Sequence, residues 1–304
     1  MDRLREMALF VAAADAGSFA QAAVRAGVSP PSVTRAIASL EHRLGALLFT
    51  RTTRKLSLTE PGALFLESSR RLLADIDSAE KEASGETTTP RGHLRVTGSV
   101  TFGRSLLSSV LSAFLDQHKE VTASLMLFDR VVDLVEEGID VGVRIGDLPS
   151  SSLMARRVGE VRRMLVASPD YMTCQPHPSE PMDLQYHAII GFTGLAQGNE
   201  WQFGDGTRPV AISPRLEVND ASAALAMAKA GNGITLALSY MVADDITAGA
   251  LTHVLDAYMP SPVPVHLVYP QSRLIAPKVR AFVDFAAPRL KQSLETLAIA
   301  RGGD

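Results

Sequence analysis

The chain has one cysteine among its 304 residues, Cys174, so it cannot form an intrachain disulfide. Lack of disulfides is typical of the reducing cytoplasm, and we expect a cytoplasmic protein. The chain also lacks an apolar run of about 18 residues, the length that a membrane-crossing helix requires. We therefore expect neither a disulfide scaffold nor a membrane protein.

The N-terminus carries an apolar run, Met7–Ala14, behind Arg3 and Arg5 and ending in an A-x-A tripeptide. A secretory signal peptide has this arrangement. Asp2 and Glu6 oppose that interpretation, because they cancel the positive charge that a signal peptide needs at its start. The alternative is that the run forms the packing face of a first helix.

Excess positive charge is missing from the chain as a whole, whose formal net charge is −3. The charge is unevenly distributed, however. Residues 1–58 carry eight Lys/Arg and four Asp/Glu, a charge of +4, which leaves 22 and 29 in residues 59–304, a charge of −7. A basic head on an acidic body is typical of a DNA-binding module joined to a separate domain.

Apolar spacing predicts three helices in the first 45 residues, at 4–16, about 19–25 and about 30–44. Gly17 and Gly45 are expected to end the first and third, and Ser18 and Ser29 to cap the second and third. The predicted buried stripe of the third helix consists of Val33, Ile37, Leu40 and Leu44.

Two helices joined by a glycine-containing turn predict a helix-turn-helix, in which the start of the second helix meets base edges in the major groove. Arg35 lies off the buried stripe, and arginine commonly pairs with guanine. The alternative is a three-helix packing unit with a solvated arginine. The predicted DNA-contacting residues here are Ser29, Pro30, Pro31, Ser32, Thr34 and Arg35.

A basic, hydroxyl-rich segment follows the third helix and lies between two short apolar stretches. This pattern predicts a β-hairpin, or wing, whose tip contacts phosphate oxygens. A solvated basic turn is the alternative. The predicted wing residues are Arg51, Thr52, Arg54 and Lys55.

The order of these pieces from Phe10 to Gly62 resembles the signature of LysR-type transcriptional regulators. The stretches that carry the resemblance are FVAAADAGSFAQAA and VSPPSVTRAIASLEHRLGALLFTRTTRKLSLTEPG. The family commonly has serine where this chain has Thr34, which keeps the hydroxyl. The resemblance implies a winged helix-turn-helix, a dimerising linker helix and an effector-binding domain.

Residues 59–84 are expected to form that linker helix. Its apolar positions alternate at spacings of four and three, which is typical of a coiled-coil seam between two chains. The alternative is a helix packed on its own domain. A homodimer or homotetramer would place two recognition helices on an interrupted palindrome in double-stranded DNA. The predicted dimerisation residues are Phe65, Leu72, Ile76 and Ala79.

Residues 85–92 have the composition of a hinge, and residues 93–304 alternate strands with helices, which indicates α/β architecture with largely parallel sheets. Crossing strands are expected to divide this body into lobe I, about 93–165 and 267–304, and lobe II, about 166–266. The stretch NDASAALAMAKAGNGITLAL from Asn219 is similar to the LysR-type effector domain, which is two-lobed and periplasmic-binding-protein-like.

Ser99 follows the first strand of the body and precedes a helix, whose N-terminus would favour a negatively charged ligand. Arg144 ends another strand of the same lobe. We therefore predict that a small organic acid binds between the lobes, with an aromatic acid as one option. The alternative is that Ser99 only caps the helix and Arg144 pairs with Asp147. The predicted effector-binding residues are Ser99, Val100, Thr101, Phe102, Arg144, Phe192 and Asn219.

Residue patterns for catalysis are lacking. The seven histidines are scattered, no G-x-S-x-G motif occurs, and Ser78-Ala79-Glu80-Lys81 matches S-x-x-K without its companion motifs. We expect no metal and no cofactor. The alternatives to a regulator are an exported small-molecule carrier, which leaves residues 1–60 without a role, and an α/β enzyme, which lacks a catalytic constellation.

Overall fold

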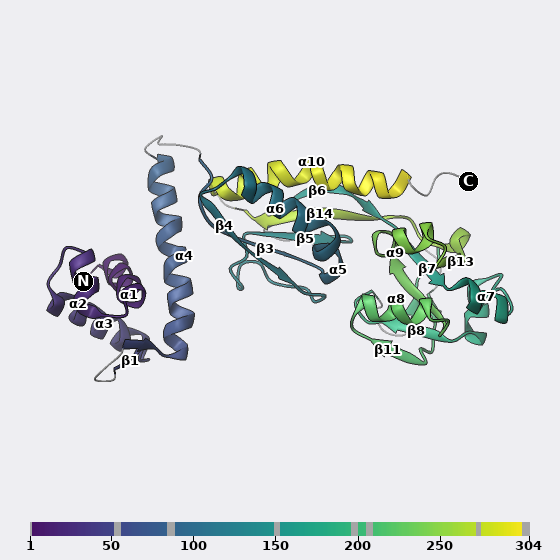
Figure 1. The fold of residues 1–304 in the computed structure, drawn as a ribbon, viewed down its shortest axis with the longest axis horizontal. Helices are drawn as coiled ribbons and strands as arrows, with labels where there is room; N and C mark the ends of the chain where they lie inside the picture. The colour runs from purple at the N-terminus through teal and green to yellow at the C-terminus, as the bar shows by residue number, and fades with distance from the viewer. Residues whose placement is uncertain are drawn as a thin grey trace. The chain divides into compact units, whose positions relative to one another are not determined.

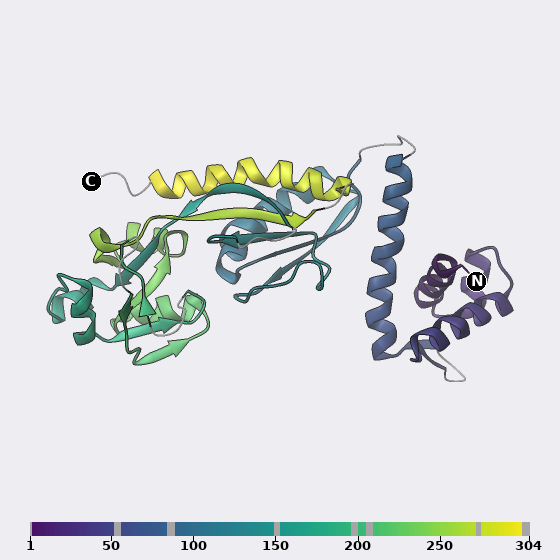
Figure 2. The same cartoon turned by 180° about the vertical axis from the view of Figure 1, so that it is seen from behind.

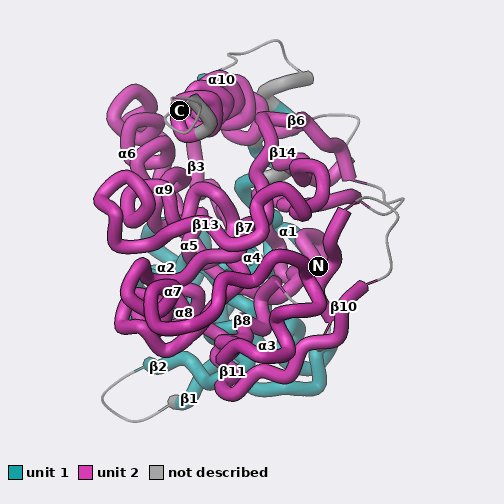
Figure 3. Tube along the Cα trace, turned by 90° about the vertical axis from the view of Figure 1, so that its right-hand side faces the viewer, with its two compact units in different colours: residues 1–89 teal, residues 90–304 magenta. Residues whose placement is uncertain are grey.

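The computed structural model of the chain describes residues 2–51, 56–83, 89–148, 153–195, 200–204, 209–271 and 275–299. The chain divides into an N-terminal unit, Met1–Thr89, and a C-terminal unit, Pro90–Asp304, which Figure 3 colours separately. Each unit has buried hydrophobic clusters of its own, as expected of separate domains.

The N-terminal unit begins with three helices, α1 (Arg3–Ala16), α2 (Phe19–Arg25) and α3 (Pro30–Leu44), which confirms the helices predicted there. Gly17 and Gly45 end α1 and α3 with φ angles of 59° and 66°, in the left-handed region that glycine adopts readily. The predicted cap of α2 is also confirmed, because the Ser18 hydroxyl accepts a hydrogen bond from the Gln21 N–H.

An antiparallel hairpin follows α3, formed by β1 (Phe49–Arg51) and β2 (Leu56–Leu58). Helix α4 (Glu60–Ala83) comes next, where the linker helix is predicted. Its first turn lies so close to the hairpin that a Cβ on Gly62 would be 2.0 Å from the Leu48 carbonyl oxygen. This approach requires glycine.

Aromatic rings hold the N-terminal unit together. The Phe10 ring of α1 lies with its centroid 5.3 Å from that of Phe49 and 5.4 Å from that of Phe65. Phe19 of α2 meets Phe49 edge-on. The apolar run Met7–Ala14 is thus part of a packed helix, in agreement with the alternative to a signal peptide.

Lobe I of the C-terminal unit is built on a five-stranded sheet in the order β4-β3-β5-β14-β6. β3 is parallel to β4 and β5, whereas β14 is antiparallel to β5 and β6, so the sheet is mixed rather than largely parallel. Figure 2 shows α10 lying along β14 and β6. The elements are β3 (Gly92–Gly98), α5 (Val100–Phe102), the π-turn η1 (Gly103–Leu107), α6 (Ser108–Gln117), β4 (Val121–Leu127), β5 (Val141–Ile145), β6 (Leu153–Val161), β14 (Val263–Pro270) and α10 (Pro277–Ile299).

Lobe II has a second five-stranded sheet, in the order β11-β8-β12-β7-β13 (Figure 1). Two buried hydrophobic clusters join this sheet to residues of α7 and α8. Here too the sheet is mixed, because β7 runs antiparallel to both of its neighbours. The elements are β7 (Arg163–Ala167), α7 (Pro169–Cys174), η2 (Pro181–Tyr186), β8 (Ile189–Phe192), β9 (Glu200–Trp201), β10 (Val210–Ala211), β11 (Leu216–Val218), α8 (Ala221–Lys229), β12 (Ile234–Leu238), α9 (Ser239–Thr247), β13 (Thr252–Val254) and η3 (Asp256–Tyr258).

The chain crosses between the lobes twice, between β6 and β7 and between β13 and β14. The predicted boundaries at 165/166 and 266/267 fall inside β7 and β14. Each of these strands stays in one sheet along its whole length, so both boundaries need correction by a few residues.

The predicted alternation of strands and helices fails between β4 and β5, where residues 131–133 have no regular structure and residues 134–138 form turns. The Asp133 carboxylate accepts hydrogen bonds from the backbone N–H groups of Val135 (2.8 Å) and Glu136 (3.0 Å). This local bonding competes with the backbone hydrogen bonds of a helix, so no helix separates these two strands.

Candidate functional site

The exposed start of α3 carries the residues predicted to contact DNA. Ser29 occupies the N-cap and Pro30 the first helical position. The Ser29 hydroxyl bonds the Ser32 hydroxyl at 2.8 Å rather than capping a backbone N–H, and the Thr34 hydroxyl donates to the Pro30 carbonyl at 3.3 Å. These bonds fix the polar side chains on the helix surface.

Arg35 lies one turn into α3 and is exposed, with its Nε donating to the Pro31 carbonyl at 3.4 Å. The opposite face of the helix is buried through Val33, Ile37 and Leu40. Leu44, predicted to complete that stripe, is 39% exposed. The burial pattern therefore turns the Arg35 side outward, as the helix-turn-helix interpretation requires.

Glu6 of α1 connects α1 to α3 through hydrogen bonds. Its carboxylate is almost fully buried and accepts hydrogen bonds from the Ser39 hydroxyl (2.7 Å) and the Arg43 guanidinium (2.8 Å). Burial alone would raise the pKa of Glu6, but these two bonds outweigh burial and hold the pKa below its usual value. The sequence analysis missed this role because a lone acidic residue in a first turn has no distinctive pattern.

The hairpin is anchored by a second glutamate. One oxygen of Glu41 accepts hydrogen bonds from the backbone N–H groups of Leu48 (2.8 Å) and Phe49 (3.3 Å). The hairpin therefore leaves α3 in a fixed direction. Of the predicted wing residues, Thr52, Arg54 and Lys55 lie outside the described residues, as does the side chain of Arg51.

The predicted seam of α4 divides between two environments. Phe65 packs on Phe10, and Ser69 is fully buried, so both belong to the core of their own unit. Leu72, by contrast, is 42% exposed and Ile76 half-buried, while the Ala79 side chain is not described. The role of Phe65 in dimerisation stays a prediction, although part of its side chain is used in the core of its own unit. Leu64 is a further apolar residue on the same helix and is 70% exposed.

A cavity of about 400 Å³ lies in the C-terminal unit, walled by both lobes. Three of the predicted effector residues line it: Ser99, Arg144 and Phe192. The further lining residues are Thr97, Gly98, Phe128, Asp129, Arg130, Val131, Val132, Val143, Ile145, Gly146, Arg163, Thr193, Gly194, Leu195, Leu238, Tyr240, Met241 and Val263.

The other four predicted effector residues are not among those that line this cavity. Phe102 is fully buried and packs edge-on against Tyr240, with ring centroids 5.3 Å apart. Val100 and Thr101 lie on the same helical turn, and Asn219 is exposed. The role of these four residues in effector binding stays a prediction.

The alternative roles predicted for Ser99 and Arg144 are not found either. Ser99 makes no side-chain cap; its hydroxyl lies 3.5 Å from the hydroxyl of Tyr240. Arg144 donates to the Val132 carbonyl oxygen rather than pairing with Asp147. Burial in this wall raises the pKa of the Tyr240 hydroxyl, so Tyr240 remains a neutral donor.

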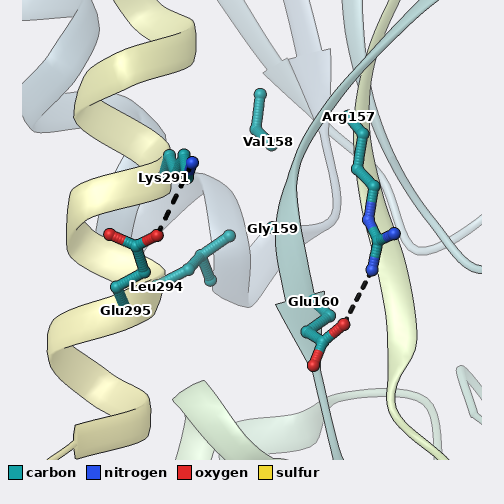
Figure 4. Close-up of a pocket in the computed structure, with 7 residues that line it drawn as sticks. All are labelled: Arg157, Val158, Gly159, Glu160, Lys291, Leu294 and Glu295. Carbon is teal, nitrogen blue, oxygen red and sulfur yellow. Dashed lines mark hydrogen bonds and ion pairs between the residues drawn. The ribbon is translucent and has the colours of Figure 1, made fainter.

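A second cavity, of about 440 Å³, lies between β6 and α10 (Figure 4). Leu294 points toward Gly159, where a Cβ would lie 2.7 Å from the leucine Cδ1. The charged side chains around it form pairs within their own elements, Arg157 with Glu160 and Lys291 with Glu295. No charge of the described lining is left for a ligand, so this cavity is a weaker candidate.

Within the described ranges, no group of three or more His, Cys, Asp or Glu could hold a metal ion. No single described helix is long and apolar enough to span a membrane. Helices α1 and α2 pass that test only as a pair, bent by 119°.

Two family profiles match the chain. Residues 4–63 match the family described as "Bacterial regulatory helix-turn-helix protein, lysR family", and residues 87–291 match "LysR substrate binding domain". Among curated proteins, an HTH-type transcriptional repressor of Pseudomonas aeruginosa is 34% identical over 289 residues, covering 94% of this chain and 91% of the relative.

Solved structures give the same result. The LysR-type regulator CrgA of Neisseria meningitidis is 30% identical with a TM-score of 0.61, covering 94% of this chain and 98% of CrgA. The full-length virulence activator AphB of Vibrio cholerae is 28% identical with a TM-score of 0.59, covering 94% and 98%. The likeness thus extends over both units.

Proposed function

This chain belongs to the LysR family of bacterial transcriptional regulators, and we propose that α3 reads its promoter sequence while a small organic acid bound between the lobes gates its activity. The family membership makes it a regulator with a DNA-binding helix-turn-helix and an effector-binding domain, which acts as an oligomer and not as an enzyme. We place it in the cytoplasm, where the DNA is.

The exposed start of α3 carries the DNA proposal. Its face from Ser29 to Arg35 combines hydroxyls with a guanidinium, the groups that bond phosphates and base edges. The anchors at Glu6 and Glu41 hold the helix and the hairpin in place. Arg51, Thr52, Arg54 and Lys55 are proposed to add phosphate contacts.

A gel-shift assay on the chain's own upstream DNA tests this proposal. Arg35→Ala should weaken binding to the specific site by about 1–3 kcal/mol and binding to random DNA much less, because a base contact is lost. Arg280→Ala, an exposed arginine of the C-terminal unit, is the matched control and should bind normally. Equal losses on both DNAs would show that Arg35 contacts only the backbone.

The chain is proposed to dimerise through the exposed side of α4, with Leu64, Leu72, Ile76 and Ala79 in the seam. Two recognition helices related by a two-fold axis would then read an interrupted palindrome. Because residues 1–89 form a compact unit, sedimentation of that fragment tests the seam. A monomer at tens of micromolar would contradict it.

The composition of the interlobe cavity supports the proposal that the effector is an organic acid. Its lining has three arginines, Arg130, Arg144 and Arg163, against one acidic residue, Asp129. Aromatic and aliphatic side chains make up much of the remaining wall, which suits the apolar body of a small ligand.

A further inference from the structure

The polar groups around the interlobe cavity differ in whether they already have partners. Arg130 holds Glu137 through two hydrogen bonds, of 2.8 and 3.1 Å. Arg144 donates to the Val132 carbonyl. Arg163 is a half-buried residue, and no hydrogen bond or ion pair joins its side chain to another described residue. A half-buried cation without a partner is unfavourable unless a ligand or water supplies one.

The helix start, by contrast, is already occupied by an anion. The Val100 N–H, the donor that a ligand's acid group would use, bonds the Asp129 carboxylate at 3.0 Å. A negatively charged ligand placed there would meet that carboxylate at close range and be repelled. The acid group therefore belongs elsewhere in the cavity.

Arg163 is held rigidly at its backbone. It opens β7 opposite Leu238 of β12, directly after the crossing from lobe I. The adjacent Arg162 exchanges two bonds with Ser239: its N–H donates to the serine hydroxyl (3.1 Å), and its carbonyl accepts from the serine N–H (2.8 Å). A contact made by Arg163 is thus made at the crossing between the lobes.

We propose that Arg163 binds the carboxylate of the effector. This inference rests on the proposed function and specifies which residue holds the acid group of the ligand. The acid group is held by lobe II, and the apolar body lies against Phe128, Phe192 and Met241.

The same arrangement defines the class of ligand. One carboxylate satisfies Arg163, whereas Arg130 and Arg144 already have partners and Asp129 adds a negative charge to the lining. A volume of about 400 Å³ and a wall with several aromatic rings suit a single-ring or short-chain acid. The expected class is a monocarboxylic acid with an apolar, preferably aromatic body, and not a phosphate or a dicarboxylate.

Calorimetry on the full-length protein tests this assignment. The probes are monocarboxylates from acetate to 3-phenylpropionate, each measured beside its uncharged amide. Arg163→Gln removes the charge and Arg163→Lys keeps it. Arg162→Gln is the matched control, because Arg162 is the exposed neighbour of Arg163 and does not line the cavity. Urea midpoints verify that each variant is folded.

The expected result is that at least one acid binds the wild type more tightly than its amide does. Arg163→Gln should weaken that acid about 10- to 100-fold, the loss typical of a charge-assisted hydrogen bond, and leave the amide unchanged. Arg163→Lys should retain most of the preference, and Arg162→Gln all of it.

Two other results would overturn the assignment in different ways. An acid preference that persists in Arg163→Gln would refute the role of Arg163 while leaving an acid effector in place. Failure of every acid to bind the wild type better than its amide would refute the organic-acid effector itself, together with the role of Arg163.

Discussion

The N-terminal unit gathers the residues proposed to read DNA bases on one short stretch, Ser29 to Arg35, whereas the cavity of the C-terminal unit is lined by seven separate segments. Those segments are 97–99, 128–132, 143–146, 163, 192–195, 238–241 and 263. A single helix can display the first set, because 3.6 residues per turn bring them to one face. The second set exists only after two sheets have formed and the chain has crossed between them. Single substitutions should therefore affect the stability of the two units in different ways.

Gly62→Ala should have the largest effect on stability, and that effect should be confined to the N-terminal unit. The new Cβ would lie 2.0 Å from the Leu48 carbonyl oxygen, so α4 and the hairpin must separate. We expect the N-terminal unit to lose about 2–4 kcal/mol of unfolding free energy. Calorimetry of the full chain should show only that unit's transition shifted.

Gly17→Ala is the matched control for this change. Gly17 has a φ of 59° with no heavy atom within 4 Å of a new Cβ, so it tests backbone strain without overlap. Its cost should be about 1 kcal/mol. A larger loss than for Gly62→Ala would mean that the close approach at the hairpin is easily relieved.

Glu6→Gln should have an intermediate effect, of about 1–2 kcal/mol at pH 7, because the bond from Arg43 loses its charged acceptor. The folded-state pKa of Glu6 lies below its ordinary value of 4.5. Its contribution is therefore full above that pH and lost as the pH falls through the folded pKa.

Urea unfolding of residues 1–89 at pH 7 and at pH 3 measures this dependence. The difference in unfolding free energy between wild type and Glu6→Gln should shrink on acidification. An equal difference at both pH values would show that the charge of Glu6 contributes nothing and that only its shape is needed.

Arg104→Met should have the smallest effect on stability. It tests whether the two lobes of the C-terminal unit are coupled by side-chain contacts. Arg104 sits in the π-turn of lobe I and donates to the Ser222 hydroxyl in lobe II at 3.1 Å, a bond between exposed groups. Its loss should cost less than about 1 kcal/mol. Ser222→Ala should cost the same, and the double variant no more than either, since the residues share one bond.

Additive losses in that double-mutant cycle would mean that the two lobes are not coupled at this point. The cavity of the C-terminal unit would then depend on fewer long-range contacts than its seven segments imply.

The sequence predicted the N-terminal unit well because its signals are local. Gly17, Ser18 and Gly45 specify helix ends through backbone angles and side-chain bonds that involve near neighbours. The seam of α4 was harder to predict, because periodicity alone does not distinguish Phe65, which packs on Phe10, from exposed Leu72. Both are apolar residues on a helix, and only tertiary packing separates them.

The cavity was predicted only in part, and the reason is again physical. Ser99, Arg144 and Phe192 follow or end strands, which is a sequence signal. Arg163 looked like an ordinary strand residue, because its position at the crossing depends on pairing with β12, far along the chain. Asn219 carries a family resemblance but is exposed and does not line the cavity.

The carboxylate of Asp129, which bonds the start of α5, affects how the cavity distinguishes its effector from common inorganic anions. Inorganic phosphate and sulfate bind readily to bare helix N-termini. A regulator with such an unshielded site would be filled by the common anions of the cell whether or not its own signal was present. By bonding the Val100 N–H itself, Asp129 makes that position repel them. The chain could then respond to a scarce acid in the presence of abundant ions, because discrimination comes from a charge that excludes competitors.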